Sequence, residues 1–559
     1  MSASDPLRVR WLGRVRYEEA AALQRALHAE RAGDYLLLLE HPPVYTLGVR
    51  TRPEHLLASV ASSGAGVVRA DRGGDVTYHG PGQLVGYPVL DVPSGPGSIP
   101  RYVHTIEQLV IDVLCDIGLV TGRLEGYPGV WAGHDGPDPR KICAIGVRVD
   151  RGRSLHGFAL NVTTDLSMFG HIVPCGIADK AVTSLSAEGV AVSLKEVVDA
   201  VCRRAGTGFA FGGAERELDR QDVAFTQAQG ARPGRSRADE EAAQARPSDR
   251  HLAVAGVDLS HAVLLRERKP DFLRAPMRLG GEVLGLRSTL KGLGLATVCE
   301  EAGCPNLSEC WADGTATFMI NGERCTRACG FCLVDTRRPL PPDPGEPVRV
   351  AAAVEAMGLA HAVVTTVARD DLADGGAGGV VATIEAIRAH CPGTAVEVLI
   401  SDCKGEESAL GAIFAARPDV LNHNVETVSR LQRAARPSAS YARSLAVLAR
   451  AKQARLTTKS SIMVGLGETI GEVRSTLADL RSVGVDIVTI GQYLRPSARH
   501  LPVARWWTPE ELRGLAADGL AMGLSHVEAS PLTRSSYHAR QAAIAARSGS
   551  LVTAGGERP

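Results

Sequence analysis

Residues 299–332 read CEEAGCPNLSECWADGTATFMINGERCTRACGFC and contain six of the 12 cysteines in this chain. The last three, Cys325, Cys329 and Cys332, have the spacing CxxxCxxC. Three thiolates on one short loop can each bind a different iron of a cubane iron–sulfur cluster. Three protein ligands leave one iron open, and an open coordination position is typical of a metal centre that does chemistry.

Zinc and disulfide bonds are the alternative uses of such a cysteine-rich stretch. A three-sulfur loop can bind zinc with a histidine as the fourth ligand. Zinc ribbons usually pair CxxC with CxxC, however, and neither cysteine triplet in this stretch has that spacing. A disulfide framework is disfavoured because the chain shows no secretory signal and has enough core-forming residues to fold without covalent staples.

The spacing CxxxCxxC is also the signature of the radical S-adenosylmethionine (SAM) enzymes, and residues from about 265 to 540 resemble one family of them, the lipoyl synthases. The segments that carry the resemblance include TVCEEAGCPNLSECW, CTRACGFC, NHNVET, MVGLGET and RSSYHA. The resemblance implies that Cys325, Cys329 and Cys332 bind a [4Fe–4S] cluster that cleaves SAM. It also implies a second, auxiliary [4Fe–4S] cluster, whose ligands are Cys299, Cys304, Cys310 and Ser536.

Apolar strand patterns alternate with helical patterns through the rest of this half of the chain. Strands that are apolar on both faces favour a parallel sheet. The expected strands cover residues 315–320, 362–367, 395–401, 419–425, 456–464 and 485–490, and the expected helices include residues 350–359, 380–390, 441–453 and 508–522. Six such units and the resemblance together predict a partial (β/α)6 barrel. Polar residues where the strands end, such as 369–371, 422–427 and 458–459, are candidates for its pocket.

The first 212 residues form a separate predicted α/β domain, in which two segments stand out. Strands are expected over residues 35–40, 141–149 and 155–162. Residues 72–83, RGGDVTYHGPGQ, are rich in glycine, which lets backbone amides approach a ligand closely. A glycine-rich hairpin is the alternative, and a P-loop is excluded because no Gly-Lys-Ser/Thr follows. Cys175 lies between proline and glycine on a constrained turn, which makes it a candidate nucleophile.

Residues from about 10 to 205 resemble the lipoyl(octanoyl) transferases, through RGGDVTYHGPGQ, GVWAG, KICAIGV, HGFALNV and IVPCGI. The resemblance implies the α/β fold of the biotin and lipoate ligases, with Cys175 as the nucleophile and Lys141 as its partner. An ammonium close to a thiol favours the thiolate and can pass a proton as the acyl group moves. The implied acyl-binding residues are Arg72, Gly73, Gly74, Asp75, Val76, Thr77, Tyr78, His79, Ala144, Ile145, Gly146, Gly157, Phe158 and Ala159.

Together the two resemblances imply consecutive steps of lipoate biosynthesis. The first half would move octanoyl from acyl carrier protein to Cys175, and then to a lysine of a lipoyl domain in 2-oxoacid dehydrogenase E2 subunits or the glycine cleavage H protein. The second half would insert sulfur at C6 and C8 of that octanoyl group, with SAM as cosubstrate and a ferredoxin or flavodoxin as reductant. An ATP-dependent lipoate ligase is the alternative for the first half. An impaired or non-catalytic iron–sulfur domain is the alternative for the second.

Three positions depart from the lipoyl synthase pattern. Cys403 stands where the family usually has phenylalanine, and Ser461 stands where it usually has glycine. Thr533 replaces the valine that precedes Arg534. None of these is an expected cluster ligand, but Ser461 is expected to crowd a place where the backbone approaches a ligand.

Composition and charge fit a soluble enzyme of two domains. Lys+Arg and Asp+Glu each total 62, so the formal net charge is zero and no global basic field attracts nucleic acid or anionic lipid. No apolar run approaches the ~20 residues that a membrane span needs, so we expect a cytoplasmic enzyme. Residues 213–260 are rich in charge, Ala, Gln, Gly and Pro, and are predicted to be a flexible linker between domains at 1–212 and 261–559.

Overall fold

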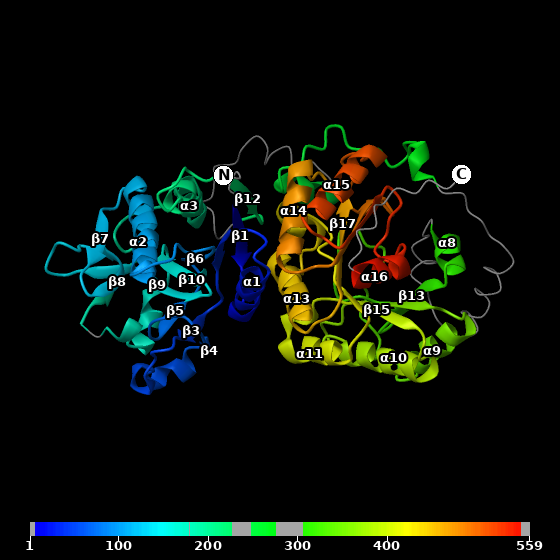
Figure 1. The fold of residues 1–559 in the computed structure, drawn as a ribbon, viewed down its shortest axis with the longest axis horizontal. Helices are drawn as coiled ribbons and strands as arrows, with labels where there is room; N and C mark the ends of the chain where they lie inside the picture. Colours follow the sequence, from blue (N-terminus) through cyan, green and yellow to red (C-terminus); the bar gives the residue numbers. More distant parts are fainter. Residues whose placement is uncertain (1–5, 178, 226–246, 275–305, 549–559) are drawn as a thin grey trace. The chain divides into compact units, whose positions relative to one another are not determined.

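The computed structural model describes residues 6–177, 179–225, 247–274 and 306–548. The chain divides into two compact units, Met1–Gly234 and Arg235–Pro559. Each unit combines helices with a sheet, the first drawn from blue to green and the second from green to red in Figure 1. The predicted α/β fold of each half is therefore confirmed.

A nine-stranded mixed sheet forms the body of the first unit, in the order β12-β1-β2-β6-β10-β9-β8-β7, with β11 paired to β9. Its strands are β1 (Leu7–Arg14), β2 (Tyr35–Glu40), β6 (Gln83–Val89), β7 (Thr121–Leu124), β8 (Tyr127–Ala132), β9 (Arg140–Asp150), β10 (Arg153–Asn161), β11 (Ala181–Val182) and β12 (Leu218–Asp222). Every residue of β2, YLLLLE, is buried, because β1 and β6 pair with it on either side and both of its faces are covered.

Among the described residues, three α-helices pack on this sheet. α1 (Tyr17–Glu30) packs on β6 and β10. α2 (Ser98–Asp116) and α3 (Leu194–Gly208) pack against each other and share an apolar core with the sheet. The capping box of Ser193 and Glu196 fixes the start of α3, because each side chain accepts a backbone amide of the other residue.

A smaller sheet of three strands, in the order β4-β3-β5, carries part of the candidate site. It consists of β3 (Val44–Leu47), β4 (Gly66–Arg69) and β5 (Thr77–His79). β5 pairs with β3, whereas β6 pairs with β2 and β10. The glycine-rich segment 72–83 is therefore not a simple hairpin, since it leads through β5 into β6 and joins the two sheets.

The structure corrects both ends of the predicted linker. β12 pairs in parallel with β1, and Phe225 stacks on Trp11 with 4.8 Å between ring centroids, so ordered structure of the first unit continues to residue 225. β12 was not predicted because its sequence, LDRQD, is mostly charged. Charged residues are nevertheless common on the edge strand of a sheet. At the other end, α5 (Pro247–Val254) belongs to the second unit, where the Ala255 carbonyl accepts a hydrogen bond from Arg430 at 2.6 Å. Residues 226–246 lie outside the described residues.

A parallel sheet of seven strands forms the body of the second unit, in the order β13-β14-β15-β16-β17-β18-β19. Its strands are β13 (Thr315–Ile320), β14 (His361–Thr366), β15 (Ala395–Leu399), β16 (Val420–Asn422), β17 (Thr458–Val464), β18 (Ile487–Gln492) and β19 (His526–Ser530). The six predicted strands are confirmed. β19 was not predicted, because its sequence HVEAS is too short and too polar to indicate a buried strand.

Helices follow most of these strands, and those that accompany the first four strands share an apolar core with them. They are α9 (Glu346–Ala356), α10 (Ala377–His390), α11 (Glu407–Ala415), α13 (Tyr441–Gln453), α14 (Ile470–Ser482) and α15 (Pro509–Ala521). Because the strands are parallel, their carboxyl ends and the loops that follow them gather at one edge of the sheet. Within the described ranges, no helix is both long and apolar enough to cross a membrane.

Candidate active sites

Cys175 lies on a strained turn in the first unit, which we call the Cys175 turn (residues 173–177). Its φ of 56° and ψ of 19° are left-handed values that non-glycine residues rarely adopt. Two backbone hydrogen bonds of 2.9 Å hold the turn, from the Cys175 amide to the Val76 carbonyl and from the Val173 amide to the His55 carbonyl. Cys175 is partly exposed, whereas Cys143 is fully buried in the core. The turn therefore leaves the Cys175 side chain partly exposed instead of burying it in the core.

The Cys175 turn borders a cavity of about 1330 Å³. Lys141 lines the same cavity, together with all of the predicted acyl-binding residues except Val76 and Tyr78. Those two side chains pack instead into an apolar cluster with Tyr45 and Phe169. Further lining residues that no sequence pattern indicated come from separate elements of the fold, and they include Tyr17, Arg50, Arg52, His55 and Tyr87.

Arg72 is a buried cation close to Cys175. Its guanidinium donates to the Thr46 hydroxyl from Nε (3.2 Å) and Nη2 (2.8 Å), and to the Gly73 carbonyl from Nη1 (3.1 Å). Burial lowers the pKa of Arg72, and the charge interaction with Cys175 is the largest effect that opposes this shift. Because these hydrogen bonds hold it, the guanidinium is a fixed positive charge on the wall of the cavity that Cys175 borders.

His79 holds Thr46, the hydrogen-bond partner of Arg72, in place. His79 Nε2 lies 3.2 Å from the Thr46 hydroxyl, and Nδ1 lies 2.7 Å from Gln83 Oε1. Since Thr46 Oγ1 accepts from Arg72, its own hydrogen is directed to His79 Nε2, and His79 donates from Nδ1. Burial holds the pKa of His79 well below its usual value of 6.5, so the ring is neutral.

Lys141, the predicted partner of Cys175, lies on β9 with 7% exposure. Its ammonium is 4.8 Å from the ring centroid of Trp131, where the face of the indole stabilises a cation. Among the described residues, no hydrogen bond or ion pair joins Lys141 to Cys175, although both line the cavity. The two cations of the site thus differ in position, since Arg72 is held by Thr46 and Gly73 and Lys141 lies on Trp131.

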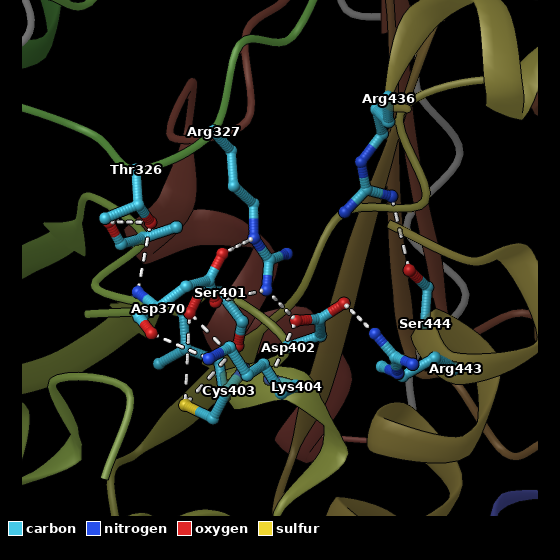
Figure 2. A network of polar contacts seen from close by, with 12 residues as sticks. Thr326, Arg327, Asp370, Ser401, Asp402, Cys403, Lys404, Arg436, Arg443 and Ser444 are labelled. Carbon is cyan, nitrogen blue, oxygen red and sulfur yellow. Dashed lines mark hydrogen bonds and ion pairs between the residues drawn. The ribbon is translucent and has the colours of Figure 1, made fainter. Parts of the chain in front are cut away.

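The loop that carries Cys325, Cys329 and Cys332 follows β13, at the carboxyl edge of the parallel sheet. Arg327, between the first two cysteines, anchors it (Figure 2). Arg327 donates to the two carboxylate oxygens of Asp370 at 2.7 and 2.9 Å, and to Asp402 at 2.5 Å. The Asp402 side chain is fully buried. Because a buried charge is stable only when it is paired, this network fixes the position of the cysteine loop.

The three thiols fit an iron–sulfur cluster in their donor chemistry. The amides of Arg327 and Ala368 point at Cys325 Sγ, at 3.4 and 3.3 Å, and hydrogen bonds of this kind tune cluster thiolates. Burial raises the pKa of Cys329 to about 12 and also raises the pKa of Cys332, and the charge of Cys325 adds to both shifts. The three sulfurs therefore lie close enough for their charges to interact. In the part of the chain that the structure describes, however, no three Cys, His, Asp or Glu side chains are grouped closely enough to hold a metal ion.

Cys310 and Ser536, two of the four predicted ligands of the auxiliary cluster, lie on segments that contact each other. Cys310 is on α8 (Leu307–Ala312), and Ser536 is on the loop after β19, residues 534–537, which we call the RSSY loop. The Tyr537 hydroxyl joins the two segments by donating to the Glu309 carboxylate at 3.2 Å. The other two predicted ligands, Cys299 and Cys304, lie outside the described residues.

A buried polar network holds Ser535 in the RSSY loop. Lys459 lies 3.0 Å from Glu397, and both side chains are almost completely buried. Asn422 Nδ2 lies 2.9 Å from Glu397 Oε1 and 2.9 Å from Ser535 Oγ, and the serine hydroxyl donates to Asn424 Oδ1 at 3.2 Å. The predicted pocket candidates Asn422, Asn424 and Lys459 are thus linked to the loop that carries Ser536.

The three departures from the lipoyl synthase pattern, Cys403, Ser461 and Thr533, all lie in buried positions. Cys403 is 4% exposed and its Sγ lies 3.9 Å from Ser401 Oγ (Figure 2). The neighbouring Asp402 still pairs with Arg327, so this departure leaves the anchor of the cysteine loop intact. Ser461 is 6% exposed on β17, and the crowding expected there stays a prediction.

Two family models match separate parts of the chain. Residues 16–205 match the lipoyl protein ligase A/B catalytic domain, and residues 319–480 match the radical SAM superfamily. The lipoyl synthase of Rubrobacter xylanophilus is 54% identical to this chain over 288 residues, which cover 51% of this chain and 90% of that protein. The chain belongs to the lipoyl synthase family. The lipoyl synthase of Mycobacterium avium is also 54% identical, over 283 residues that cover 50% of this chain and 92% of that protein.

This member of the lipoyl synthase family also contains a lipoate ligase or transferase domain, so both predicted resemblances are confirmed. Membership implies that SAM and [4Fe–4S] chemistry belong to the second unit. Among solved structures, the bi-partite lipoate protein ligase of Thermoplasma acidophilum is similar to this chain. That similarity covers 40% of this chain and 89% of the ligase chain, with 19% identity and a TM-score of 0.33.

Proposed function

We propose that this chain catalyses two consecutive steps of lipoate biosynthesis. The first unit transfers octanoyl from acyl carrier protein, through Cys175, to a lysine of a lipoyl domain. The second unit then inserts two sulfur atoms, at C6 and C8 of the octanoyl group. The observation that carries the proposal is the presence of two sites in one chain: a presented thiol beside a large cavity, and a CxxxCxxC loop on a radical SAM sheet.

In the first site, the Cys175 sulfur attacks the thioester carbonyl of octanoyl-acyl carrier protein, and the pantetheine thiol leaves with the proton that Cys175 gives up. The fixed charge of Arg72 favours the attacking thiolate, and the Lys141 amine takes the proton of the Cys175 thiol and passes it to the pantetheine sulfur. A lysine amine of the lipoyl domain then attacks octanoyl-Cys175. The carbon–sulfur bond breaks, the amide forms, and the proton that the amine loses restores the Cys175 thiol. One thioester replaces another, so the transfer needs no ATP.

In the second site, a cluster on Cys325, Cys329 and Cys332 would supply the electron that cleaves SAM. A second cluster, on Cys299, Cys304, Cys310 and Ser536, would supply the sulfur. Contacts of the described residues support the positions of two of these segments. Arg327 fixes the cysteine loop against Asp370 and Asp402. The contacts of Tyr537 and Ser535 fix the RSSY loop against α8 and the sheet. An enclosed site is required because a carbon radical reacts with whatever it meets.

The partners follow from the chemistry of the two steps. Octanoyl-acyl carrier protein is the donor, and lipoyl domains of 2-oxoacid dehydrogenase E2 subunits and the glycine cleavage H protein are the acceptors. A ferredoxin or flavodoxin is the reductant of the second site.

Intact-protein mass spectrometry with octanoyl-acyl carrier protein, in the absence of ATP, tests the first site. The wild-type chain is expected to gain the mass of one octanoyl group, and Cys175→Ala is expected to gain none. Cys115→Ala, which removes an exposed cysteine of α2, is the matched control and keeps the adduct. Labelling that requires free octanoate and ATP would contradict octanoyl transfer and favour a ligase.

Metal analysis of the anaerobically purified chain tests the second site. Two [4Fe–4S] clusters predict about eight iron and eight sulfide per chain. Cys329→Ala and Ser536→Ala should each lower a different part of the iron–sulfur signal, while Cys391→Ala, at a partly buried cysteine of another loop, should leave the iron content unchanged. Zinc in place of iron contradicts the proposal.

A further inference from the structure

Two exposed arginines, Arg50 and Arg52, line the cavity that Cys175 borders, at the place where it opens to solvent. Among the described residues, no hydrogen bond or ion pair occupies the guanidinium of either side chain. A guanidinium presents its N–H donors in a planar fork that matches the oxygens of a phosphate or carboxylate. The donors of both arginines are therefore available to an anion that enters the cavity.

Backbone hydrogen bonds hold the segment that carries these arginines, residues 50–55. The Arg50 amide donates to the Gly74 carbonyl at 3.0 Å, which ties the segment to the glycine-rich wall of the cavity. At the other end, the His55 carbonyl accepts the Val173 amide of the Cys175 turn at 2.9 Å. Since Arg50 precedes His55 by five residues, their Cα atoms are at most about 18 Å apart. The arginines and the nucleophile thus lie along one short, fixed stretch of wall.

The charged side chains that line the cavity leave an excess of positive charge. Five cations line it, against three carboxylates, those of Asp75, Glu107 and Glu125. Two of these carboxylates are already paired, since Glu107 lies 2.9 Å from Arg123 and Asp75 lies 2.6 Å from His55. A concave protein wall focuses the field of such an excess and attracts an anion. The cavity is therefore suited to a ligand that carries a negative charge.

The proposed reaction brings one such charge to the cavity. The octanoyl chain is neutral, and so are the amides of the pantetheine arm that carries it. The acceptor of the second step is a lysine, whose ammonium form the two arginines repel. The charged group of the donor arm is the phosphodiester that joins pantetheine to acyl carrier protein, and this group lies at the end of the arm away from the reacting thioester.

We propose that Arg50 and Arg52 form the binding site for the phosphodiester of the donor's phosphopantetheine arm. The proposal rests on the proposed function of Cys175. Arginine binds phosphate oxygens through paired, charge-assisted hydrogen bonds. The site holds the arm by its outer end and directs the thioester inward to Cys175. It therefore selects phosphopantetheine thioesters over other thioesters of the same acyl chain, and it transfers no proton.

Loading of the full-length chain from three donors tests this site: octanoyl-pantetheine, octanoyl-4′-phosphopantetheine and octanoyl-acyl carrier protein. Intact mass spectrometry follows the octanoyl adduct, and ATP is omitted, so the donor supplies the phosphate. We expect kcat/KM of the wild-type chain to be about tenfold higher for octanoyl-phosphopantetheine than for octanoyl-pantetheine, because hydrogen bonds to a charged group are worth about this factor.

Variants of the two arginines show whether this preference depends on them. Arg50→Gln combined with Arg52→Gln removes both charges, and the ratio of the two kcat/KM values should fall to about one. Arg50→Lys combined with Arg52→Lys keeps the charges and should retain a preference for the phosphorylated donor. Arg203→Gln, at an exposed arginine of α3 that does not line the cavity, is the matched control and should keep the wild-type ratio. A ratio of donors is insensitive to a general loss of active protein.

Failure of the phosphate site can be told apart from failure of the octanoyl transfer. A wild-type chain that loads from none of the three donors overturns the proposed function of Cys175, and the phosphate site with it. A wild-type chain that loads equally well from both pantetheine thioesters overturns the phosphate site alone, as does a glutamine variant that keeps the wild-type ratio. A loss confined to octanoyl-acyl carrier protein means that the arginines contact the carrier protein itself, which also overturns the phosphate site.

Discussion

Arg72 holds a positive charge near Cys175 while its hydrogen bonds are directed to Thr46 and Gly73. Arg72→Met keeps much of the side-chain volume but removes the charge. We expect alkylation of Cys175 by iodoacetamide at neutral pH to become about tenfold slower, because a nearby cation favours the thiolate. Peptide mass spectrometry measures this rate. Arg204→Met, which breaks an exposed ion pair with Asp116, should leave it unchanged, and equal rates in all three proteins would contradict the role of Arg72.

Arg327 has the corresponding role in the second unit, where it neutralises the fully buried Asp402. We expect Arg327→Gln to lower the free energy of unfolding by about 3 kcal/mol, because removing one partner leaves a buried charge insufficiently paired. The cysteine loop should then bind less iron. Thermal unfolding and iron analysis of the purified chain measure the two effects.

Arg337→Gln is the matched control for this prediction. Arg337 lies close in sequence to the cysteine loop, but its side chain is 76% exposed and pairs with Asp335. Exposed pairs contribute little, so stability and iron content should remain those of the wild type. Similar losses of stability and iron in both variants would contradict the prediction. They would show that the loss of any nearby arginine affects the cysteine loop, whether or not the arginine belongs to the buried network.

At the level of elements, His41 joins the end of β2 to β6 and to Val15, which lies between β1 and α1. Its Nδ1 donates to the Val15 carbonyl at 2.7 Å, and its Nε2 accepts the Tyr87 hydroxyl at 2.8 Å. Burial lowers the pKa of His41 from 6.5 to about 4. A histidine with a depressed pKa contributes stability above its unfolded value, and this contribution is lost as the pH falls from 6.5 toward 4.

The first unit should therefore lose about 3 kcal/mol through His41 alone between pH 6.5 and 4. His41→Gln keeps a polar side chain that does not titrate, so its unfolding temperature should fall less over this range. Thermal unfolding of both proteins at pH 7 and pH 5, where few carboxylates have been protonated, provides the comparison. A wild-type transition that falls no more than that of the variant would contradict this assignment.

The elements also show what sequence patterns can and cannot predict. Residues 35–40 and 315–320 are apolar on both faces, and each forms a buried strand because only the interior of a sheet accommodates such a run. β12 and β19 were missed because their residues are largely polar, and pairing with a neighbour, not local preference, makes them strands.

Some residues of the candidate site could likewise be predicted from the sequence, and others could not. Cys175 was predictable because proline and glycine flank it in sequence, and the structure places it on a strained turn. His55 was not predictable, because it precedes Cys175 by more than a hundred residues and meets the Cys175 turn only through the packing of the small sheet.

At the level of the whole molecule, one chain contains the site that makes octanoyl-lysine and the site that uses it. We expect the intact chain to form lipoyl groups faster than an equimolar mixture of residues 1–234 and 235–559 when lipoyl-domain substrate is dilute. Covalent linkage raises the effective concentration of the second site around a shared substrate. Time courses at several substrate concentrations measure this advantage, which should disappear at saturation. Equal rates at low concentration would contradict coupling between the units.

The most direct test of the account supplies the anaerobic full-length chain with octanoyl-acyl carrier protein, an unmodified lipoyl domain, SAM and a strong reductant, and follows the mass of the lipoyl domain. The wild-type chain is predicted to produce first the octanoyl form and then the lipoyl form. Cys175→Ala should leave the lipoyl domain unmodified, and Cys329→Ala should stop at the octanoyl form. A wild-type reaction that ends at octanoyl, or a lipoyl product made by Cys175→Ala, would contradict two consecutive reactions at these two sites.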